Sequence, residues 1–422
     1  MRTPLRFVLR SDVPLNREEE TPPREGAAIS WEAFLATYLP ALILALGTGI
    51  AVPALPTLAK SFNVSFGIAS LVVTMFLFGN LLGTIPSGWM IDRFGRRPVL
   101  IAGPLLAASM AFLVSQTNSF PELLVLRFVN GFAAQMWIMS RLAAISHGAA
   151  PSQRGRLVSW MFGMDSTGRL AGPVLGGFIA NELGARVPFL VYASLALVAL
   201  IPTALFAKDT PRSERVTGTR TAPSATRSLR EIVMPRLPYF GVALFAGLTR
   251  GPLQADLLYL YAAFAYTLGP RPIGFLATSA SLISLPIGFL AGWMMDRFGR
   301  KRTMVPGFTG VAISMLALAF TAFLHLSLAW YVVLFLIGVA LQALTGGSIQ
   351  TVGTDVAPAE ARGTFLGIWR FAGQGGQALS PLMFALIADH LNYGSAFLFI
   401  ALSATTVAYL LIRYIPETRI TE

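Results

Sequence analysis

The 422-residue chain contains no cysteine. This absence excludes disulfide bonds, thiolate metal sites and cysteine nucleophiles. The three histidines, His147, His325 and His390, are scattered near the ends of apolar segments and form no visible metal-binding cluster. The sequence also shows no Ser-His-Asp set and no phosphate-binding glycine loop. We therefore expect neither an enzyme nor a protein that carries a metal ion or another cofactor.

Charge is scarce as well: 12% of the residues are charged, whereas 55% are hydrophobic and the mean hydropathy is +0.64. A soluble domain with so little charge could not cover its surface with polar groups, so the composition predicts a membrane protein. The net charge of +12 does not indicate a nucleic-acid partner, because the basic residues are concentrated in short loops between apolar segments. That distribution is typical of the cytoplasmic side of a membrane protein.

The apolar segments predict an all-α membrane protein with twelve transmembrane helices in two pseudo-symmetric six-helix bundles. The first segment carries no charge and is long enough to cross a hydrocarbon core of about 30 Å. A basic linker rich in Ser, Thr and Pro separates the two sets of six. The predicted spans are Ala33–Ala59, Phe66–Met90, Val99–Val114, Leu123–Ile145, Leu157–Ala180, Val187–Ala207, Pro238–Leu260, Ile273–Met295, Thr303–Phe323, Leu328–Thr351, Thr364–Ala388 and Ser395–Tyr414. The predicted domains are an N-terminal tail (1–30), a bundle (31–207), the linker (208–236), a second bundle (237–415) and a C-terminal tail (416–422).

Lysine and arginine predict the orientation of these spans. On the side opposite the termini we place only Lys60, Arg186 and Arg271. Because cytoplasmic loops carry an excess of basic residues, both termini are expected in the cytoplasm of a cell-membrane protein. The terminal side contains the two tails, the linker and Arg93, Arg96, Arg97, Arg154, Arg156, Arg297, Arg300, Lys301, Arg302 and Arg362.

One loop sequence occurs twice, which makes the chain an internal repeat. Ser87–Pro98 joins the second and third spans, and Gly292–Arg302 joins the eighth and ninth. Both copies resemble the Gly-x-x-x-Asp-Arg-x-Gly-Arg-Arg/Lys loop of the major facilitator superfamily of secondary transporters. The resemblance covers the chain from about Trp31 onward. It implies a conformational gate formed by Gly88, Asp92, Arg93, Gly95 and Arg96 in the first copy and by Gly292, Asp296, Arg297, Gly299 and Arg300 in the second.

This resemblance also implies how the protein works. The superfamily has parallel repeats with a substrate site between the halves near the membrane midplane, and it transports small molecules by alternating access. When the cytoplasmic side is closed, we expect Asp92 to lie at the start of span eleven near Ala361–Thr364. Asp296 is expected to do the same at span five, near Gly155. We expect a monomer in the lipid bilayer.

The fifth span contains a glycine-proline motif that resembles a signature of the superfamily's antiporters. A longer form of that signature begins with another glycine, where this chain has Ser159. Tight helix packing alone is the alternative explanation, because small residues let helices approach closely. The motif residues are Gly168, Gly172, Pro173, Gly176 and Gly177.

Polar residues of the fourth span are the next candidates. Arg127 and Gly131 resemble the Arg-x-x-x-Gly motif of proton-coupled drug exporters. Arg127, Asn130, Ala134 and Arg141 share one helical stripe, which is expected to face a wet cavity because a lipid-facing Arg is costly. For Arg141 the equally weighted alternative is snorkelling to the cytoplasmic interface. Gln135 and, in the repeat-related tenth span, Gln342 are further candidates.

Other charges within the spans form two potential pairs. Asp165 and Arg169 are four residues apart on span five, so Asp165 is either a proton carrier or one half of a permanent ion pair within the helix. Arg250 and Asp256 lie on either side of Gly251-Pro252 in span seven, and their spacing brings them together only if the proline kink realigns them. Arg370 is an unpaired charge in span eleven.

The first functional hypothesis is proton-coupled export of small hydrophobic or amphipathic compounds. Five arginines but only two aspartates lie within the spans, and span one has no carboxylate, although many cation exporters of the family have one there. An importer or uniporter of a small organic anion therefore remains an alternative, since a fold does not fix direction or substrate. A non-transporting membrane sensor or lipid translocator is the alternative from another class.

Overall fold

A computed structural model describes residues 34–148, 151–207, 234–254, 256–346, 348–358, 361–415 and 417. The predicted N-terminal tail, nearly all of the predicted linker and most of the C-terminal tail lie outside the described residues. The described part is helical, as expected, and its helices trace twelve passages in the order of the predicted spans. This arrangement confirms the predicted fold class.

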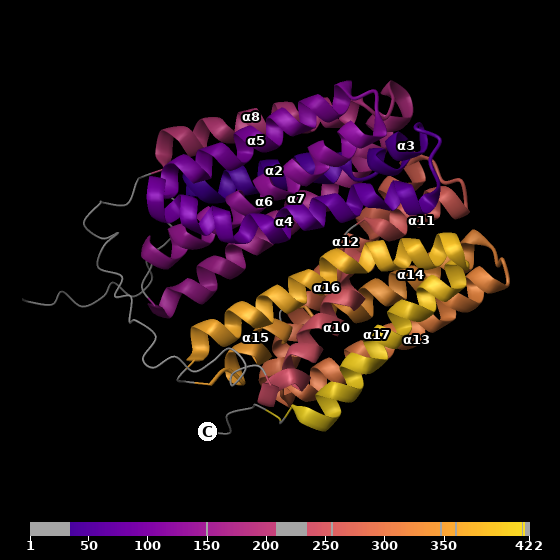
Figure 1. The fold of residues 1–422 in the computed structure, drawn as a ribbon. Coiled ribbons are helices and arrows are strands. Elements are labelled where there is room, and N and C mark those ends of the chain that lie inside the picture. The colour runs from indigo at the N-terminus through magenta and orange to yellow at the C-terminus, as the bar shows by residue number, and fades with distance from the viewer. Residues whose placement is uncertain are drawn as a thin grey trace, which may run out of the picture.

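The first six passages form one bundle and the last six form the other (Figure 1). The first bundle contains η1 (Phe34–Tyr38), α2 (Leu39–Ala51), α3 (Ala54–Lys60), α4 (Phe66–Phe94), α5 (Arg96–Gln116), α6 (Phe120–Gly148), α7 (Pro151–Leu183) and α8 (Val187–Phe206). The second contains η2 (Met234–Arg236), α10 (Leu237–Gln254), α11 (Leu257–Ala265), α12 (Pro270–Phe298), α13 (Arg300–Phe323), α14 (Leu328–Ala343), α15 (Ser348–Asp355), α16 (Arg362–His390) and α17 (Tyr393–Tyr414).

Not every passage is equally apolar. Among the described residues, eight passages are long and apolar enough to cross a membrane by length and composition. Those outside this set are α7, α10 with α11, α14 with α15, and α16. These helices carry Asp165, Arg169, Arg250, Asp256 and Arg370. Charged residues in membrane helices usually face a bundle interior or a water-filled cavity, so these four passages are candidates for a part in the site, as is α6, which carries Arg127 and Arg141.

Three predicted spans are interrupted rather than continuous. Span one is divided between α2 and α3 at Val52-Pro53, span seven between α10 and α11, and span ten between α14 and α15. Each break lies near a proline or glycine, residues that membrane helices tolerate where neighbouring groups satisfy the freed backbone. Span seven ends at Ala265, five residues beyond the predicted end at Leu260.

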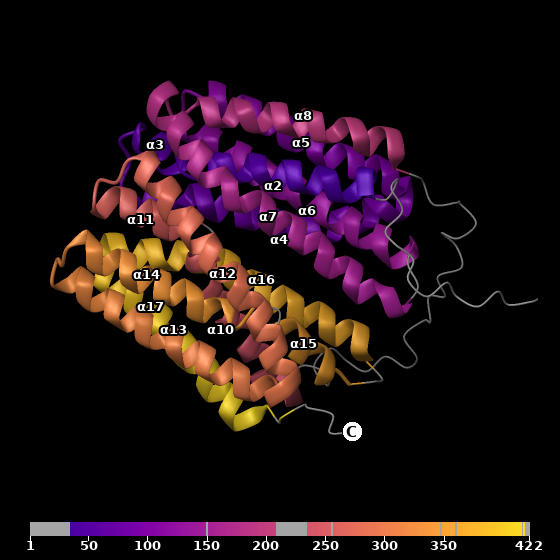
Figure 2. The same cartoon turned by 180° about the vertical axis from the view of Figure 1, so that it is seen from behind.

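The two bundles meet along two helix pairs, α4 with α16 and α7 with α12. They converge at one end and diverge toward the end where the chain enters at Phe34 and leaves at Ile415 (Figures 1 and 2). We call the latter the terminal side. A Cβ added to Gly177 of α7 would lie 3.2 Å from Gly274 Cα of α12, whereas one added to Gly163 or Gly288 would meet nothing within 4 Å. The same two helices are therefore in contact on one side and apart on the terminal side.

Polar contacts close the side opposite the termini. Asp389 at the end of α16 accepts hydrogen bonds from Ser65 Oγ (2.7 Å) and Gly67 N (2.9 Å) at the start of α4. Lys60 donates a hydrogen bond of 2.9 Å from Nζ to the Ala263 carbonyl of α11. The Phe66 ring packs edge-on against Phe384, Tyr393 and Phe264 of the other bundle. The structure is thus closed on this side and open on the terminal side.

The repeated loops adopt the same local structure in both bundles. Gly95 and Gly299 end α4 and α12 with φ angles of 97° and 100°, a region that favours glycine. The Arg93 guanidinium lies 5.6 Å from the Trp89 ring, and the Arg297 guanidinium lies 5.4 Å from the Trp293 ring. The internal repeat seen in the sequence is therefore also a structural repeat.

Candidate functional site: a cavity between the bundles

A cavity of about 800 Å³ lies between the two bundles. It is lined by residues of both, including Asn80 of α4, Tyr192 of α8, Ser281 of α12 and Gln377 of α16. Among the described residues, the charged members of its lining are Arg127, Arg169 and Asp256. Because the lining includes Gly163 and Gly288, where α7 and α12 stand apart, the cavity reaches toward the open terminal side.

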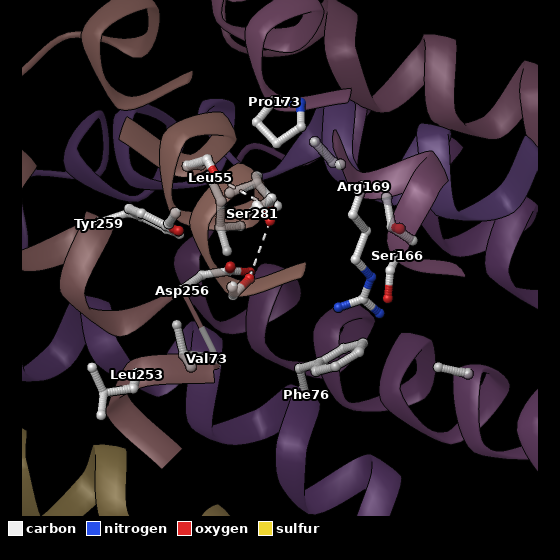
Figure 3. Close-up of a pocket in the computed structure, with 18 of the residues that line it drawn as sticks. Leu55, Val73, Phe76, Ser166, Arg169, Pro173, Leu253, Asp256, Tyr259 and Ser281 are labelled. Atoms are coloured by element: carbon white, nitrogen blue, oxygen red, sulfur yellow. Dashed lines mark hydrogen bonds between the residues drawn. The ribbon is translucent and has the colours of Figure 1, made fainter. Parts of the chain in front are cut away.

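A broken helix places Asp256 in this lining. The residue lies between the end of α10 and the start of α11, with a φ of 63°, which few residues other than glycine adopt. In Figure 3 its carboxylate and Tyr259 of α11 lie on one side of the pocket. Half-helix ends near the middle of a membrane span are typical positions for substrate and ion sites in transporters.

Arg127 enters the cavity from α6 and is oriented by two contacts with α4. Its Nε donates a hydrogen bond of 3.4 Å to the Val72 carbonyl, and its guanidinium lies 4.7 Å from the centre of the Phe76 ring. Asn130 lies one helical turn further along the same face of α6 and also lines the cavity. Of the predicted stripe, Arg127, Asn130 and Ala134 therefore face the cavity, as expected, whereas Arg141 does not.

Arg169 enters from α7, opposite Asp256. Its side chain is exposed, and its guanidinium points into the pocket in Figure 3. Asp256 lies within Coulombic range of both Arg169 and Arg127. Among the described residues, however, no ion pair of 4 Å or less involves Asp256. The cavity thus presents one carboxylate that faces two guanidinium groups without contact.

Asp165 does not pair with Arg169, so the predicted ion pair within α7 is wrong. Its partner is Arg141 of α6, which donates hydrogen bonds of 3.0 and 2.8 Å to the two carboxylate oxygens. The Arg141 guanidinium also lies 4.9 Å from the Trp137 ring. Arg141 is only 1% exposed and does not line the cavity, so both predictions for it, a place in the cavity wall and snorkelling to the interface, are wrong. This pair connects α6 to α7 inside the first bundle.

Arg250 and Asp256 likewise form no pair. Arg250 donates a hydrogen bond to the Thr345 carbonyl, which the break between α14 and α15 leaves without a helical partner. Gln342 donates a hydrogen bond of 2.7 Å from Nε2 to Thr345 Oγ1, and it lines the cavity. Arg250 therefore stabilises the end of α14, where a cation is also favoured by the helix dipole.

The remaining predicted site residues lie elsewhere. Gln135 is buried against α4 near Gly83, and Arg370 is exposed on α16; neither lines the cavity. The sequence analysis also missed Asn80 and Tyr192 in the lining. Asn80 was detectable as a polar residue in the middle of an apolar span. Tyr192 carried no such signal, because its position beside the cavity depends on how α8 packs.

Several of the residues predicted to form a gate have open space around them in this structure, and their role as a gate stays a prediction. Asp92 is exposed, and a Cβ added to Gly88, Gly292 or Gly363 would meet nothing within 4 Å. The predicted contact of Asp92 with the start of α16 belongs to the closed state and stays a prediction. The predicted contact of Asp296 with α7 near Gly155 also stays a prediction, because the side chains around Gly155 lie outside the described part of the chain. In the second bundle Arg300 pairs with Asp355, and Glu417 accepts a hydrogen bond of 2.8 Å from Arg300 N at the start of α13.

The glycine-proline motif of α7 is a packing surface for two helices. A Cβ on Gly172 would lie 2.8 Å from both Gly49 Cα and the Leu46 carbonyl of α2, and one on Gly168 or Gly176 would also collide with α2. On the other face, Gly177 and Pro173 contact α12 at Gly274. The motif therefore joins the two bundles on the closed side and brings Arg169 to the cavity wall.

Comparison with known proteins gives a consistent family assignment. The model of the Major Facilitator Superfamily matches residues 38–381 and 242–422. The tetracycline resistance protein, class B, of Escherichia coli is 29% identical over 359 residues, which cover 83% of this chain and 86% of that protein. Multidrug resistance protein 2 of Bacillus subtilis is 23% identical over 66% of this chain and 71% of its own length.

Solved structures show the same fold. The D-xylose-proton symporter has a TM-score of 0.76 at 20% sequence identity and covers 93% of this chain and 99% of its own. A partially occluded, inward-open structure of the xylose transporter XylE of Escherichia coli has a TM-score of 0.71 at 19% identity and covers 92% of this chain and 99% of its own. The chain belongs to the Major Facilitator Superfamily and is a multi-pass secondary transporter of the cell membrane, not an enzyme.

Proposed function

We propose that the protein exports small amphipathic compounds in exchange for protons, with both termini in the cytoplasm. The observation that carries this proposal is Asp256, a carboxylate in the wall of the central cavity that faces Arg127 and Arg169. Carboxylates in the interior of membrane transporters commonly serve as proton relays. Relatives of this chain are named for resistance to tetracycline, to multiple drugs and to quinolones, which supports export of such compounds.

Asp256 is a better proton-binding group than Asp165 in this structure. Both oxygens of Asp165 accept hydrogen bonds from the buried Arg141, so a proton could bind only after that pair has separated. Asp256 has no such partner among the described residues, and its cavity reaches the terminal side. We therefore assign Asp165 to the packing of α6 on α7 and Asp256 to proton binding.

Alternating access follows from the way the bundles meet. In the structure, contacts such as Asp389 with Gly67 close one side while the terminal side is open. Rocking of one bundle against the other would expose the same cavity to the opposite side. The excess of Lys and Arg on the terminal side supports a cytoplasmic position for both termini, so the structure corresponds to the inward-open state.

The test is transport in proteoliposomes that are acidic inside. Molecules whose terminal side faces outward should then accumulate a quinolone that carries both a carboxylate and a basic amine. We expect accumulation to depend on the proton gradient and to be lost in Asp256→Asn, which should exchange quinolone between the two sides without a gradient only at a raised quinolone concentration. Glu182→Gln is the matched control, because Glu182 is an exposed carboxylate at the end of α7, away from the cavity lining.

Two results would refute the proposal. Quinolone transport that is independent of the proton gradient would exclude exchange for protons. Accumulation by Asp256→Asn equal to that of the unmodified protein would exclude Asp256 as the coupling group. If the gradient instead drives an organic anion toward the terminal side, the protein is an importer of anions.

A further inference from the structure

We infer that the substrate which this site exchanges for protons is a zwitterion: an aromatic compound that carries a basic amine and an acidic oxygen group on the same molecule. The amine would bind Asp256, and the acidic group would bind Arg169 and Arg127. The inference rests on the proposed function and specifies the substrate class of that site.

The first observation is the charge of the cavity wall. Two arginines and one aspartate give the described lining a charge of +1 when Asp256 is ionised and +2 when it is protonated. No hydrogen bond or ion pair to a described residue engages the Arg169 guanidinium, and Arg127 uses only its Nε, on the Val72 carbonyl. Their planar forks of donors suit a carboxylate or another oxygen anion.

The second step follows from exchange itself. A substrate that leaves when a proton binds must compete with that proton, and the group in this lining that can bind either a proton or a cation is the Asp256 carboxylate. A purely anionic substrate would bind better once Asp256 is protonated, because the lining then has a charge of +2, and this would produce cotransport. A purely cationic substrate would neutralise Asp256 but would leave the positive charges of the two arginines without a counter-charge. Only a molecule with both charges satisfies all three side chains and still competes with the proton.

The size and chemistry of the cavity agree with such a molecule. Its volume of about 800 Å³ lies within the range of roughly 300–1,000 Å³ that is typical of sites for drug-sized ligands. Aromatic side chains contribute to the wall beside the charges, and aromatic faces suit a flat ring system. They are Phe76, Phe162, Phe189, Tyr192, Tyr259 and Phe289.

The test is binding of three related probes to the purified full-length protein in lipid nanodiscs. The probes are the zwitterionic quinolone used for transport, its methyl ester, which keeps only the amine, and its N-acetyl derivative, which keeps only the acid. We expect Arg169→Gln to weaken binding of the zwitterion and the acid at least tenfold and to leave the ester unaffected or bound more tightly. Asp256→Asn should weaken binding of the zwitterion and the ester at least tenfold and spare the acid.

Controls separate this inference from the proposed function. Asp256→Glu keeps the carboxylate and should retain most of the binding, and the melting temperature of each variant reports whether it is folded. If proton-driven quinolone transport is present but Arg169→Gln leaves binding of all three probes unchanged, the zwitterion inference fails and the proposed function stands. If none of the probes is transported with protons, the proposed function itself fails. Tighter binding of the acid probe than of the zwitterion at a pH where Asp256 is ionised would also overturn the inference.

Discussion

At the scale of single residues, the buried ion pair between Arg141 and Asp165 makes the clearest prediction. Arg141 is 1% exposed and donates two hydrogen bonds to Asp165. Asp165→Asn would leave the arginine buried without a counter-charge, and breaking such a pair from one side costs about 3–5 kcal/mol. We expect a clearly lower melting temperature in detergent.

The double variant Asp165→Asn with Arg141→Gln should recover much of the lost stability, because both charges are then removed. Arg169→Gln is the control: Arg169 faces the cavity, so its replacement should leave the melting temperature nearly unchanged. A destabilising Arg169→Gln together with a stable Asp165→Asn would contradict the observed pairing.

The sequence predicted which charged residues lie within the spans, but it did not predict their partners. Spacing of four residues suggested that Asp165 pairs with Arg169 on the same helix. The actual partner is 24 positions earlier on α6, and its choice depends on how α6 packs against α7. The sequence allowed Arg250 to pair with Asp256 only if the proline kink realigned them, and the broken span ten instead provides the Thr345 carbonyl as the acceptor.

At the scale of helices, the sequence predicted the number, order and approximate ends of the passages because most are long apolar segments and the basic loops lie on one side. The sequence marked Gly95 and Gly299 only as members of the repeated loop, and the structure shows that their positive φ angles favour glycine there. It did not predict the breaks in spans one, seven and ten. Proline and glycine are tolerated in membrane helices, so whether they break one depends on the partners that neighbouring helices offer.

The glycine motif of α7 makes a prediction about helix packing. A methyl group on Gly176 would collide with the Ile50 carbonyl oxygen of α2. This is a backbone atom, so it cannot relieve the clash by a change of rotamer. Overpacking of this kind typically costs about 1–3 kcal/mol. We expect Gly176→Ala to lower the melting temperature and the yield of folded protein.

Gly163→Ala is the matched control on the same helix, because a Cβ there meets nothing within 4 Å. Alanine is favoured over glycine in a helix by up to about 1 kcal/mol, so this variant should be neutral or slightly stabilised. Equal melting temperatures for Gly176→Ala and Gly163→Ala would show that α2 and α7 are not in close contact.

At the scale of the whole molecule, Asp389 helps to close the side opposite the termini by accepting hydrogen bonds at the start of α4. A carboxylate at a helix N-terminus is worth about 0.3–1 kcal/mol, and more when partly buried. Because this contact joins the two bundles in one state only, Asp389→Ala should shift the population several-fold toward the state that is open on this side.

The absence of cysteine makes this shift measurable with two introduced labels. Leu183→Cys at the end of α7 and Leu324→Cys at the end of α13 are exposed positions on the closed side. Spin-label distances between them should lengthen in Asp389→Ala. They should stay unchanged in Glu122→Ala, which removes a contact with Thr117 inside one bundle. Unchanged distances in Asp389→Ala would show that Asp389 does not hold this side closed.

The most direct measurement of the central claim is proton release on substrate binding. When the zwitterionic quinolone is added to the purified protein in weakly buffered solution, its amine should displace a proton from Asp256. The account predicts acidification at a pH where part of the protein carries that proton, and no acidification for Asp256→Asn. Proton uptake, or an identical release by the Asp256→Asn variant, would contradict exchange at this carboxylate.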